Sequence, residues 1–140
     1  MKFELPEKRY LLSTFSTKIR WGDMDALGHV NNAAYFRYME TARVEWLSDI
    51  GISLGKDNQS FVLANTFCTF NSPITYPCEI NINSFATELT NTRLDIVHEF
   101  VNAKEKKQVF AVGLATCVWV NLARGKAVAL PDSIKKLIKL

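Results

Sequence analysis

Long apolar runs and a large excess of one charge are both missing from this sequence of 140 residues. No apolar run approaches the roughly 18 residues of a membrane-spanning helix, so we expect no membrane span. The first ten residues contain acids and a proline where a secretory signal needs an apolar core, which favours a cytoplasmic protein. The net charge of +3 is too small to indicate a nucleic-acid-binding protein, although it suits a small anionic ligand.

Cysteine and histidine are scarce, with three and two residues respectively. Cys68, Cys78 and Cys117 are odd in number and lack metal-ligand spacing, so we expect buried free thiols. His29 and His98 belong to no ligand cluster, which argues against a zinc site, and His98 is expected to be a structural residue of a strand. The sequence therefore predicts no metal and no cofactor.

No repeat, low-complexity segment or linker divides the chain, so residues 1–140 are expected to form a single domain. Apolar residues at helical spacing predict a helix over about residues 32–49, with Gly51 as its C-terminal cap. This helix is apolar on several sides and is expected to be enclosed. A short terminal helix is predicted to begin near Pro131. Strands are predicted between turn-like segments, over residues 11–19, 61–70, 78–89, 94–101 and 108–121.

One long helix and about five strands predict an α+β fold in which an antiparallel sheet wraps around the central helix. The segment VFAVGLATCVWV, residues 109–120, is apolar on both faces and should lie in mid-sheet or at a subunit contact. The outer face of such a sheet needs a covering partner, so we expect a homodimer or homotetramer.

Two short motifs match known functional patterns without their context. GISLG, residues 51–55, fits the G-x-S-x-G nucleophile motif, but it follows a helix instead of a strand, so Ser53 is assigned to a loop. DMDALG, residues 23–28, resembles the start of a calcium loop, but Leu27 and Ala34 stand where that loop needs acids. Neither motif predicts a site.

Polar residues crowd at the start of the predicted helix, in RWGDMDALGHVNN, residues 20–32. Helix capping explains Asn31 or Asn32, but it does not explain the whole cluster. A helix N-terminus offers unpaired N–H groups that stabilise an oxyanion, and a nearby carboxylate such as Asp25 can act as general base or nucleophile. Together these groups suit attack on an acyl carbonyl.

The longer segment RWGDMDALGHVNNAAYFRYMETARVEWL, residues 20–47, closely resembles the signature of hot-dog-fold acyl-CoA thioesterases of the 4-hydroxybenzoyl-CoA thioesterase-like group. The resemblance implies a hot-dog fold and hydrolysis of an acyl-CoA to a free acid and coenzyme A. It places Asp25 at the catalytic aspartate, which attacks the carbonyl or activates water, and it assigns carbonyl polarisation to the backbone N–H of Asn32. His29 and Asn31 match the signature and are expected to shape the site.

The resemblance also indicates substrate contacts outside the signature's polar residues. Apolar residues around the helix, Tyr35 among them, are expected to line an acyl pocket. Asp23 and Glu40 stay open between a structural and a functional role. Arg93 precedes a strand, near the place where relatives bind coenzyme A phosphates, often across a subunit boundary, so it is expected to bind substrate.

Three alternatives remain beside this reading. Plant-type acyl-carrier-protein thioesterases resemble the same stretch, but they carry an asparagine where this chain has Leu27. Hot-dog hydratases have a longer aspartate-to-histidine spacing than the one between Asp25 and His29. A non-catalytic acyl-CoA-binding module on the same fold is the alternative from a different functional class.

Overall fold

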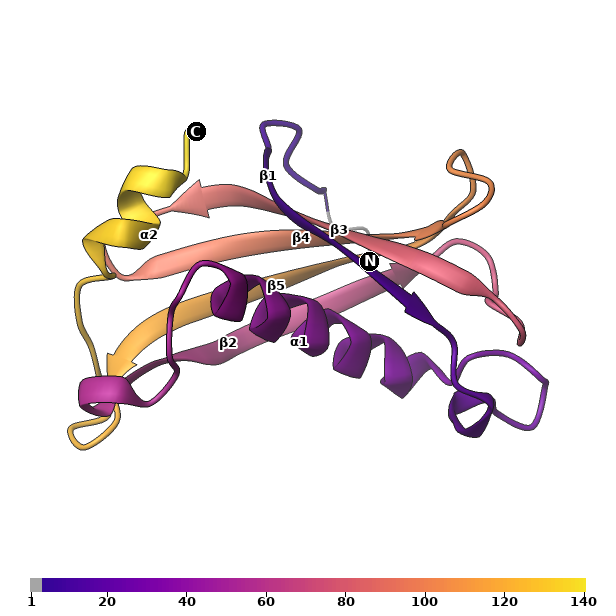
Figure 1. Ribbon diagram of the computed structural model, residues 1–140, viewed down its shortest axis with the longest axis horizontal. Coiled ribbons are helices and arrows are strands. Elements are labelled where there is room, and N and C mark those ends of the chain that lie inside the picture. Colours follow the sequence, from indigo (N-terminus) through magenta and orange to yellow (C-terminus); the bar gives the residue numbers. More distant parts are fainter. Residues whose placement is uncertain (1–3) are drawn as a thin grey trace.

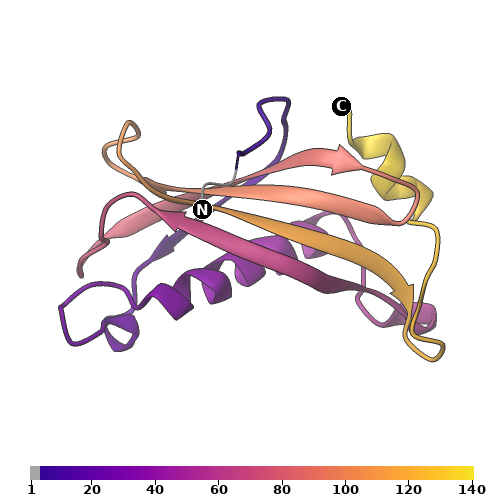
Figure 2. The ribbon, with the colours of Figure 1, turned by 180° about the vertical axis from the view of Figure 1, so that it is seen from behind.

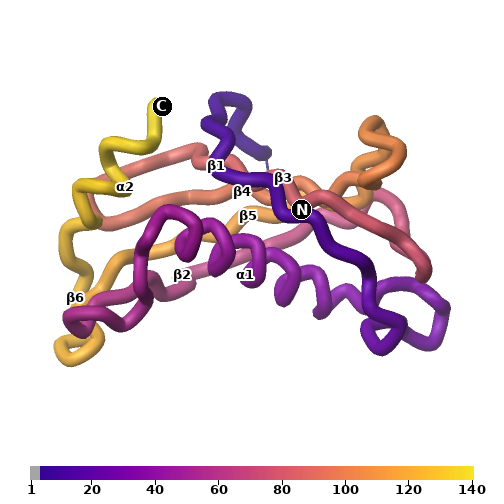
Figure 3. Tube along the Cα trace, viewed as in Figure 1, coloured from indigo at the N-terminus to yellow at the C-terminus, as the bar shows by residue number. Residues whose placement is uncertain are grey.

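The computed structural model describes residues 4–140, which form one antiparallel sheet curled around a long helix (Figure 1). The strand order is β1-β3-β4-β5-β2, and the short β6 pairs with β5 (Figure 3). This architecture confirms the expected α+β fold with a sheet wrapped around one helix. The strands are β1 (Tyr10–Lys18), β2 (Gln59–Phe70), β3 (Glu79–Leu89), β4 (Arg93–Asn102), β5 (Val109–Asn121) and β6 (Lys126–Ala127).

Helix α1 (Asn32–Asp49) begins and ends where its sequence predicts. At its start, the Asn31 side chain accepts a 3.0 Å hydrogen bond from the backbone N–H of Ala33. At its end, Gly51 has a φ of 78° and donates its N–H to the carbonyl oxygen of Ser48 at 3.0 Å. Glycine adopts this left-handed conformation without strain, so the predicted C-terminal cap is confirmed.

The core lies between α1 and the face of the sheet beneath it. Met39 of α1 is fully buried and lies over Gly113 of β5, where the missing side chain lets helix and strand approach closely. A second part of the core surrounds Trp46 near the end of α1. It includes Ile134 of α2 (Asp132–Leu137), the terminal helix that follows Pro131 as predicted.

One side of α1 is open. Strand β2 is an edge strand, because within residues 4–140 only β5 pairs with it. On the neighbouring side of α1, Glu40 and Val44 are exposed and Phe36 is partly exposed. The expectation of an enclosed helix is therefore wrong for the single chain, because the sheet curls around only part of the helix.

The remaining expectations about the sheet are largely met. Each predicted strand agrees with the structure to within two residues at both ends. Strand β5 lies in mid-sheet, between β4 and β2, and Figure 2 looks onto the outer face of these three strands. Of the three free thiols only Cys117 is buried, whereas Cys68 and Cys78 are partly exposed, so the expectation of burial is wrong for these two. No helix within residues 4–140 is long and apolar enough to cross a membrane.

Candidate active site

The loop between β1 and α1 is tied to the helix through Asp23. Its Oδ2 accepts a 2.6 Å hydrogen bond from the Tyr38 hydroxyl, and its Oδ1 lies 3.4 Å from the guanidinium of Arg37. Its backbone oxygen accepts the N–H of Asn31 at 2.8 Å. Burial, and then the bond to Asp23, raise the pKa of Tyr38, so its hydroxyl stays a donor. These contacts give Asp23 a structural role.

Asp25 occupies a tight turn that its own carboxylate closes. Its Oδ1 accepts the backbone N–H groups of Leu27 at 2.9 Å and of His29 at 3.2 Å. Its backbone N–H donates to the carbonyl oxygen of His29 at 2.7 Å, and Gly28 completes the turn with a φ of 77°. Among residues 4–140, no group forms a hydrogen bond with Asp25 Oδ2. One carboxylate oxygen is therefore held in place while the other is available for chemistry.

A cavity of about 360 Å³ opens between this turn, the first turn of α1 and the end of β2. Four of the residues that the sequence predicts at the active site line this cavity. These are Asp25, His29, Asn32 and Tyr35. The opposite wall of the cavity comes from the end of β2 and the loop after it. Sequence patterns did not connect this wall to the site, because about 40 residues separate it from the start of α1. This wall consists of Phe70, Asn71, Ser72 and Pro73.

Tyr35 gives the cavity an apolar wall. Its side chain is buried, and its ring meets that of Phe70 edge-on with 4.9 Å between centroids. Burial raises the pKa of the Tyr35 phenol, so it stays neutral at physiological pH. A neutral aromatic wall excludes water from a reacting group placed between it and Asp25.

The two asparagines at the helix start differ in role. Asn32 is the first residue of α1, so its N–H has no acceptor within the helix, and no other residue of the described chain accepts it. The side chain of Asn31 is used in the helix cap, and Asn31 does not line the cavity. The helix N-terminus therefore leaves the N–H of Asn32 without an acceptor in the described chain, and Asn32 lines the same cavity as Asp25.

Arg93 lies at the opposite end of the sheet. It pairs with Val118 of β5, whereas Phe70 at the cavity pairs with Ala111. These two positions on β5 are seven residues apart, which corresponds to about 23 Å at about 3.3 Å per residue. A single chain does not bring Arg93 to the cavity.

The guanidinium of Arg93 already has two anionic partners. Its Nη2 lies 2.8 Å from Glu88 Oε1, and its Nε lies 3.4 Å from Asp95 Oδ1. The expected contact with a coenzyme A phosphate stays a prediction, and it requires Arg93 from a second copy of the chain.

His98 lies inside the core, away from the cavity, and forms a polar chain that sequence analysis did not find. Arg43 donates to His98 Nε2 at 3.3 Å, and because arginine has only donors, Nε2 must be the accepting nitrogen. His98 Nδ1–H then donates to Ser84 Oγ at 2.7 Å. Burial, and then the charge of Arg43, lower the pKa of His98 to about 3. The expected structural role of His98 is confirmed.

Ser53 is exposed in the loop between α1 and β2. It therefore lacks the strand–turn–helix context of a nucleophilic serine, as its sequence predicts.

Known proteins resemble this chain over most of its length. Residues 19–138 match the Thioesterase-like superfamily. The long-chain acyl-CoA thioesterase FadM of Escherichia coli (strain K12) is 29% identical over 124 residues, which cover 87% of this chain and 93% of FadM. The structure of the PA2801 protein of Pseudomonas aeruginosa, a candidate thioesterase, superposes with a TM-score of 0.89 and 33% identity, covering 93% of this chain and 100% of that one.

A second solved structure agrees with this result. A candidate acyl-CoA thioesterase from Xanthomonas campestris superposes with a TM-score of 0.74 and 31% identity, covering 80% of this chain and 95% of that one. Because the family match spans residues 19–138 of the 140-residue chain, the chain belongs to the Thioesterase-like superfamily and is a thioester hydrolase with the hot-dog fold.

Proposed function

We propose that this chain hydrolyses an acyl-CoA to a free acid and coenzyme A, in the cavity between Asp25 and Asn32. One observation carries the proposal: Asp25 and Asn32, which have a carboxylate oxygen and a helix-terminal N–H without partners in the described chain, line the same cavity. The similarity to FadM, a long-chain acyl-CoA thioesterase, supports acyl-CoA as the substrate class.

The reaction uses the helix N-terminus to stabilise charge. The thioester carbonyl oxygen accepts the N–H of Asn32, where the helix dipole favours the negative charge that develops on that oxygen. Asp25 Oδ2 either attacks the carbonyl carbon or takes a proton from an attacking water. The C–S bond then breaks, and the coenzyme A sulfur takes up a proton and leaves as a thiol. Attack by water gives the free acid directly, whereas attack by Asp25 gives an acyl-aspartyl anhydride, which a water molecule then hydrolyses to release the acid and restore the carboxylate.

The environment of Asp25 prepares this carboxylate for the reaction. The two backbone bonds to its Oδ1 fix the carboxylate plane, so Oδ2 needs no reorientation before it reacts. A second hollow begins at the other side of Asp25, bordered by the exposed rings of Trp21 and Tyr76. It offers the coenzyme arm a path to solvent, while Tyr35 and Phe70 receive the acyl group.

The active assembly is a homodimer, alone or within a homotetramer. The edge of β2 carries unpaired backbone groups, and Val62 and Leu63 on this strand are 39% and 48% exposed. A second copy that covers β2 and the open side of α1 removes this apolar surface from water. Light scattering at micromolar concentration should give at least twice the monomer mass, and a fully active monomer would contradict the assembly.

The test of function is turnover of an acyl-CoA panel with detection of the released thiol. Asp25→Asn retains the size of the side chain and removes its charge, so we expect kcat to fall by at least about 100-fold in a folded protein. Ser53→Ala is the control, and its kcat should stay within a few-fold of the parent. Near-normal turnover by a folded Asp25→Asn variant would overturn the assignment. Binding of acyl-CoA without any turnover by the parent would instead identify a non-catalytic module.

A further inference from the structure

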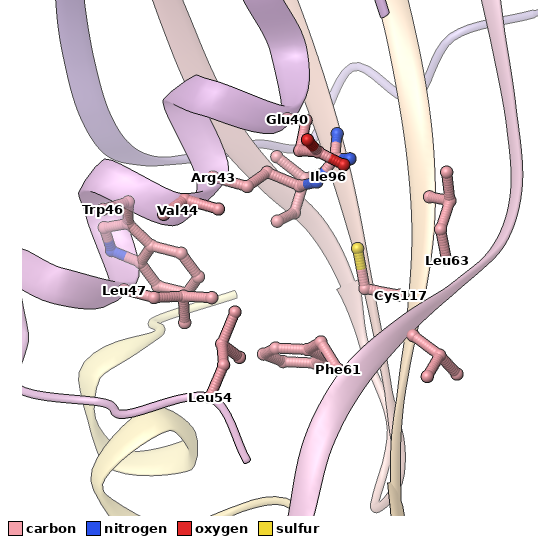
Figure 4. A pocket seen from close by; sticks show the side chains of 11 residues that line it. Glu40, Arg43, Val44, Trp46, Leu47, Leu54, Phe61, Leu63, Ile96 and Cys117 are labelled. Carbon is pink, nitrogen blue, oxygen red and sulfur yellow. The ribbon is translucent and has the colours of Figure 1, made fainter. Parts of the chain in front are cut away.

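A second, more enclosed cavity of about 150 Å³ lies toward the C-terminal end of α1, between this helix and strands β2 and β5 (Figure 4). Most of its lining is apolar. The apolar side chains include Trp46, Leu47, Leu54, Phe61 and Ile96. A dry apolar cavity of about this size holds a group as large as benzene. It therefore fits the last few atoms of a flexible apolar chain.

Arg43 is the one cation in this lining. Figure 4 shows its side chain running from α1 toward the strands. The side chain is partly buried, and its one hydrogen bond within residues 4–140 goes to neutral His98. None of the ion pairs found in the described chain includes Arg43. An arginine has five N–H donors and stays charged even when burial lowers its pKa, so its unused donors favour an anionic partner.

We infer that this cavity binds the far end of the substrate's acyl chain and that Arg43 pairs there with a terminal carboxylate. The inference rests on the proposed function and specifies its substrate class as coenzyme A thioesters of long dicarboxylic acids. The carboxylate supplies Arg43 with an ion-pair partner, which it lacks in the described chain, and the apolar lining encloses the methylene groups before it.

The spacing of the two cavities sets the length of this chain. Both lie between α1 and β2, with Asn32 and Phe70 at one end and Arg43 and Phe61 at the other. Arg43 follows Asn32 by eleven residues, which is about 16 Å at about 1.5 Å per helical residue. An extended chain advances about 1.2 Å per bond, so it covers this distance in about 13 bonds. The fitting acyl groups therefore have about 12 to 14 carbons.

Among the ionisable groups at the cavity, Arg43 is the one that carries a positive charge. His98 is neutral, and burial raises the pKa of Cys117 to about 11, so its thiol is neutral too. Glu40 also borders the cavity, and its charge favours the charged form of Arg43, but no ion pair joins the two side chains in the described chain. The Glu40 carboxylate opposes a bound anion, and Glu40→Gln should therefore increase the preference for a carboxylate.

The experiment compares two coenzyme A thioesters of equal length, about 14 carbons, one ending in a carboxylate and one in a methyl group. A bond between Arg43 and the carboxylate should raise the ratio of their kcat/KM values, carboxylate over methyl, to about tenfold or more in the parent. Arg43→Met retains the length of the stem without the charge, and its ratio should fall to about one. Arg124→Met removes an exposed arginine from the turn between β5 and β6 and should retain the parental ratio.

The two proposals fail in different ways. If neither thioester is hydrolysed, the proposed function is overturned, whereas hydrolysis of both with equal kcat/KM overturns only the carboxylate preference.

Because Arg43 also bonds His98, Arg43→Met needs a check of folding by circular dichroism. Leu54→Trp fills the cavity from an exposed loop position and leaves the bond to His98 intact. In this variant, the ratio of kcat/KM for the 14-carbon dicarboxylic thioester to kcat/KM for a four-carbon acyl-CoA should fall at least tenfold. A ratio equal to that of the parent would overturn the inference as well.

Discussion

The hydroxyl of Tyr38 donates a 2.6 Å hydrogen bond to Asp23 Oδ2, and this contact joins the second turn of α1 to the loop that carries Asp25. The same hydroxyl accepts the backbone N–H of Arg20 at 3.3 Å. A single oxygen therefore holds two points of the loop, Arg20 and Asp23, against the helix. The position of Asp25 relative to the N-terminus of α1 depends on this contact.

Tyr38→Phe tests this dependence. Loss of the hydroxyl frees the loop, so we expect kcat to fall by about tenfold, since small displacements of a reacting group are costly. The free energy of unfolding should fall by about 1 to 3 kcal/mol, the usual loss for a bond to a charged group. Tyr10→Phe is the matched control, because no hydrogen bond of the Tyr10 hydroxyl occurs in the described chain. A less stable Tyr38→Phe enzyme with parental kcat would limit the contact to a structural role.

Proline at position 32 tests the helix-terminal N–H directly. Proline lacks this donor, yet the first position of a helix accepts it readily. Asn31 has φ −56° and ψ 133°, the extended conformation that a residue before proline adopts. Asn32→Pro should therefore fold and lose about 100- to 1000-fold in kcat, as for a lost oxyanion donor. Asn32→Ala retains the N–H and should be at least tenfold more active than Asn32→Pro, and equal activities would exclude the N–H from catalysis.

The buried His98 predicts a pH dependence of stability. Its pKa of about 3 in the folded chain lies below the ordinary 6.5, so below pH 6.5 the unfolded chain binds a proton that the folded chain does not. His98 therefore stabilises the fold fully above pH 6.5 and loses this contribution as the pH falls toward 3, by at most about 1.4 kcal/mol per pH unit. Urea unfolding at pH 7 and pH 5 should show a smaller pH effect for His98→Gln than for the parent. Equal pH effects in the two proteins would refute the burial of a neutral imidazole.

Close packing of α1 on β5 predicts a steric cost at Gly113. A Cβ there would collide with Met39 Sδ and approach the carbonyl oxygen of Phe67. Gly113→Ala should lower the free energy of unfolding by about 1 to 3 kcal/mol, as overpacking of a core does. Gly22→Ala is the control, because a Cβ at Gly22 meets nothing within 4 Å. Denaturant midpoints compare the two, and equal midpoints would mean that Met39 moves aside without cost.

Local patterns predicted the elements well because their signals lie within the elements themselves. The helix has its cap at Asn31 and its stop at Gly51, and both are visible in the sequence. The order of the strands was not predicted, because register depends on contacts between distant segments. The two-residue strand β6 was missed because two residues carry no periodicity.

The candidate site was predictable only along one segment of chain. Asp25, His29 and Asn32 are close in sequence, and the structure brings them to one cavity. The wall that begins at Phe70 was not foreseen, because it meets the helix only after the sheet has formed. The role of Asp23 stayed open until the structure showed its bond to Tyr38, seven residues into α1.

The partial or full burial of the three cysteines, of which only Cys117 is fully buried, has a consequence for side reactions. Burial raises the pKa of Cys68 to about 12 and of Cys117 to about 11, and it raises that of Cys78 as well. Only a thiolate takes an acyl group from a thioester, and at pH 7 about one in 10,000 or fewer of the Cys68 and Cys117 thiols is ionised. A thioester hydrolase with these cysteines therefore offers an activated acyl group almost no sulfur nucleophile from Cys68 or Cys117, and its fold protects both thiols against acylation.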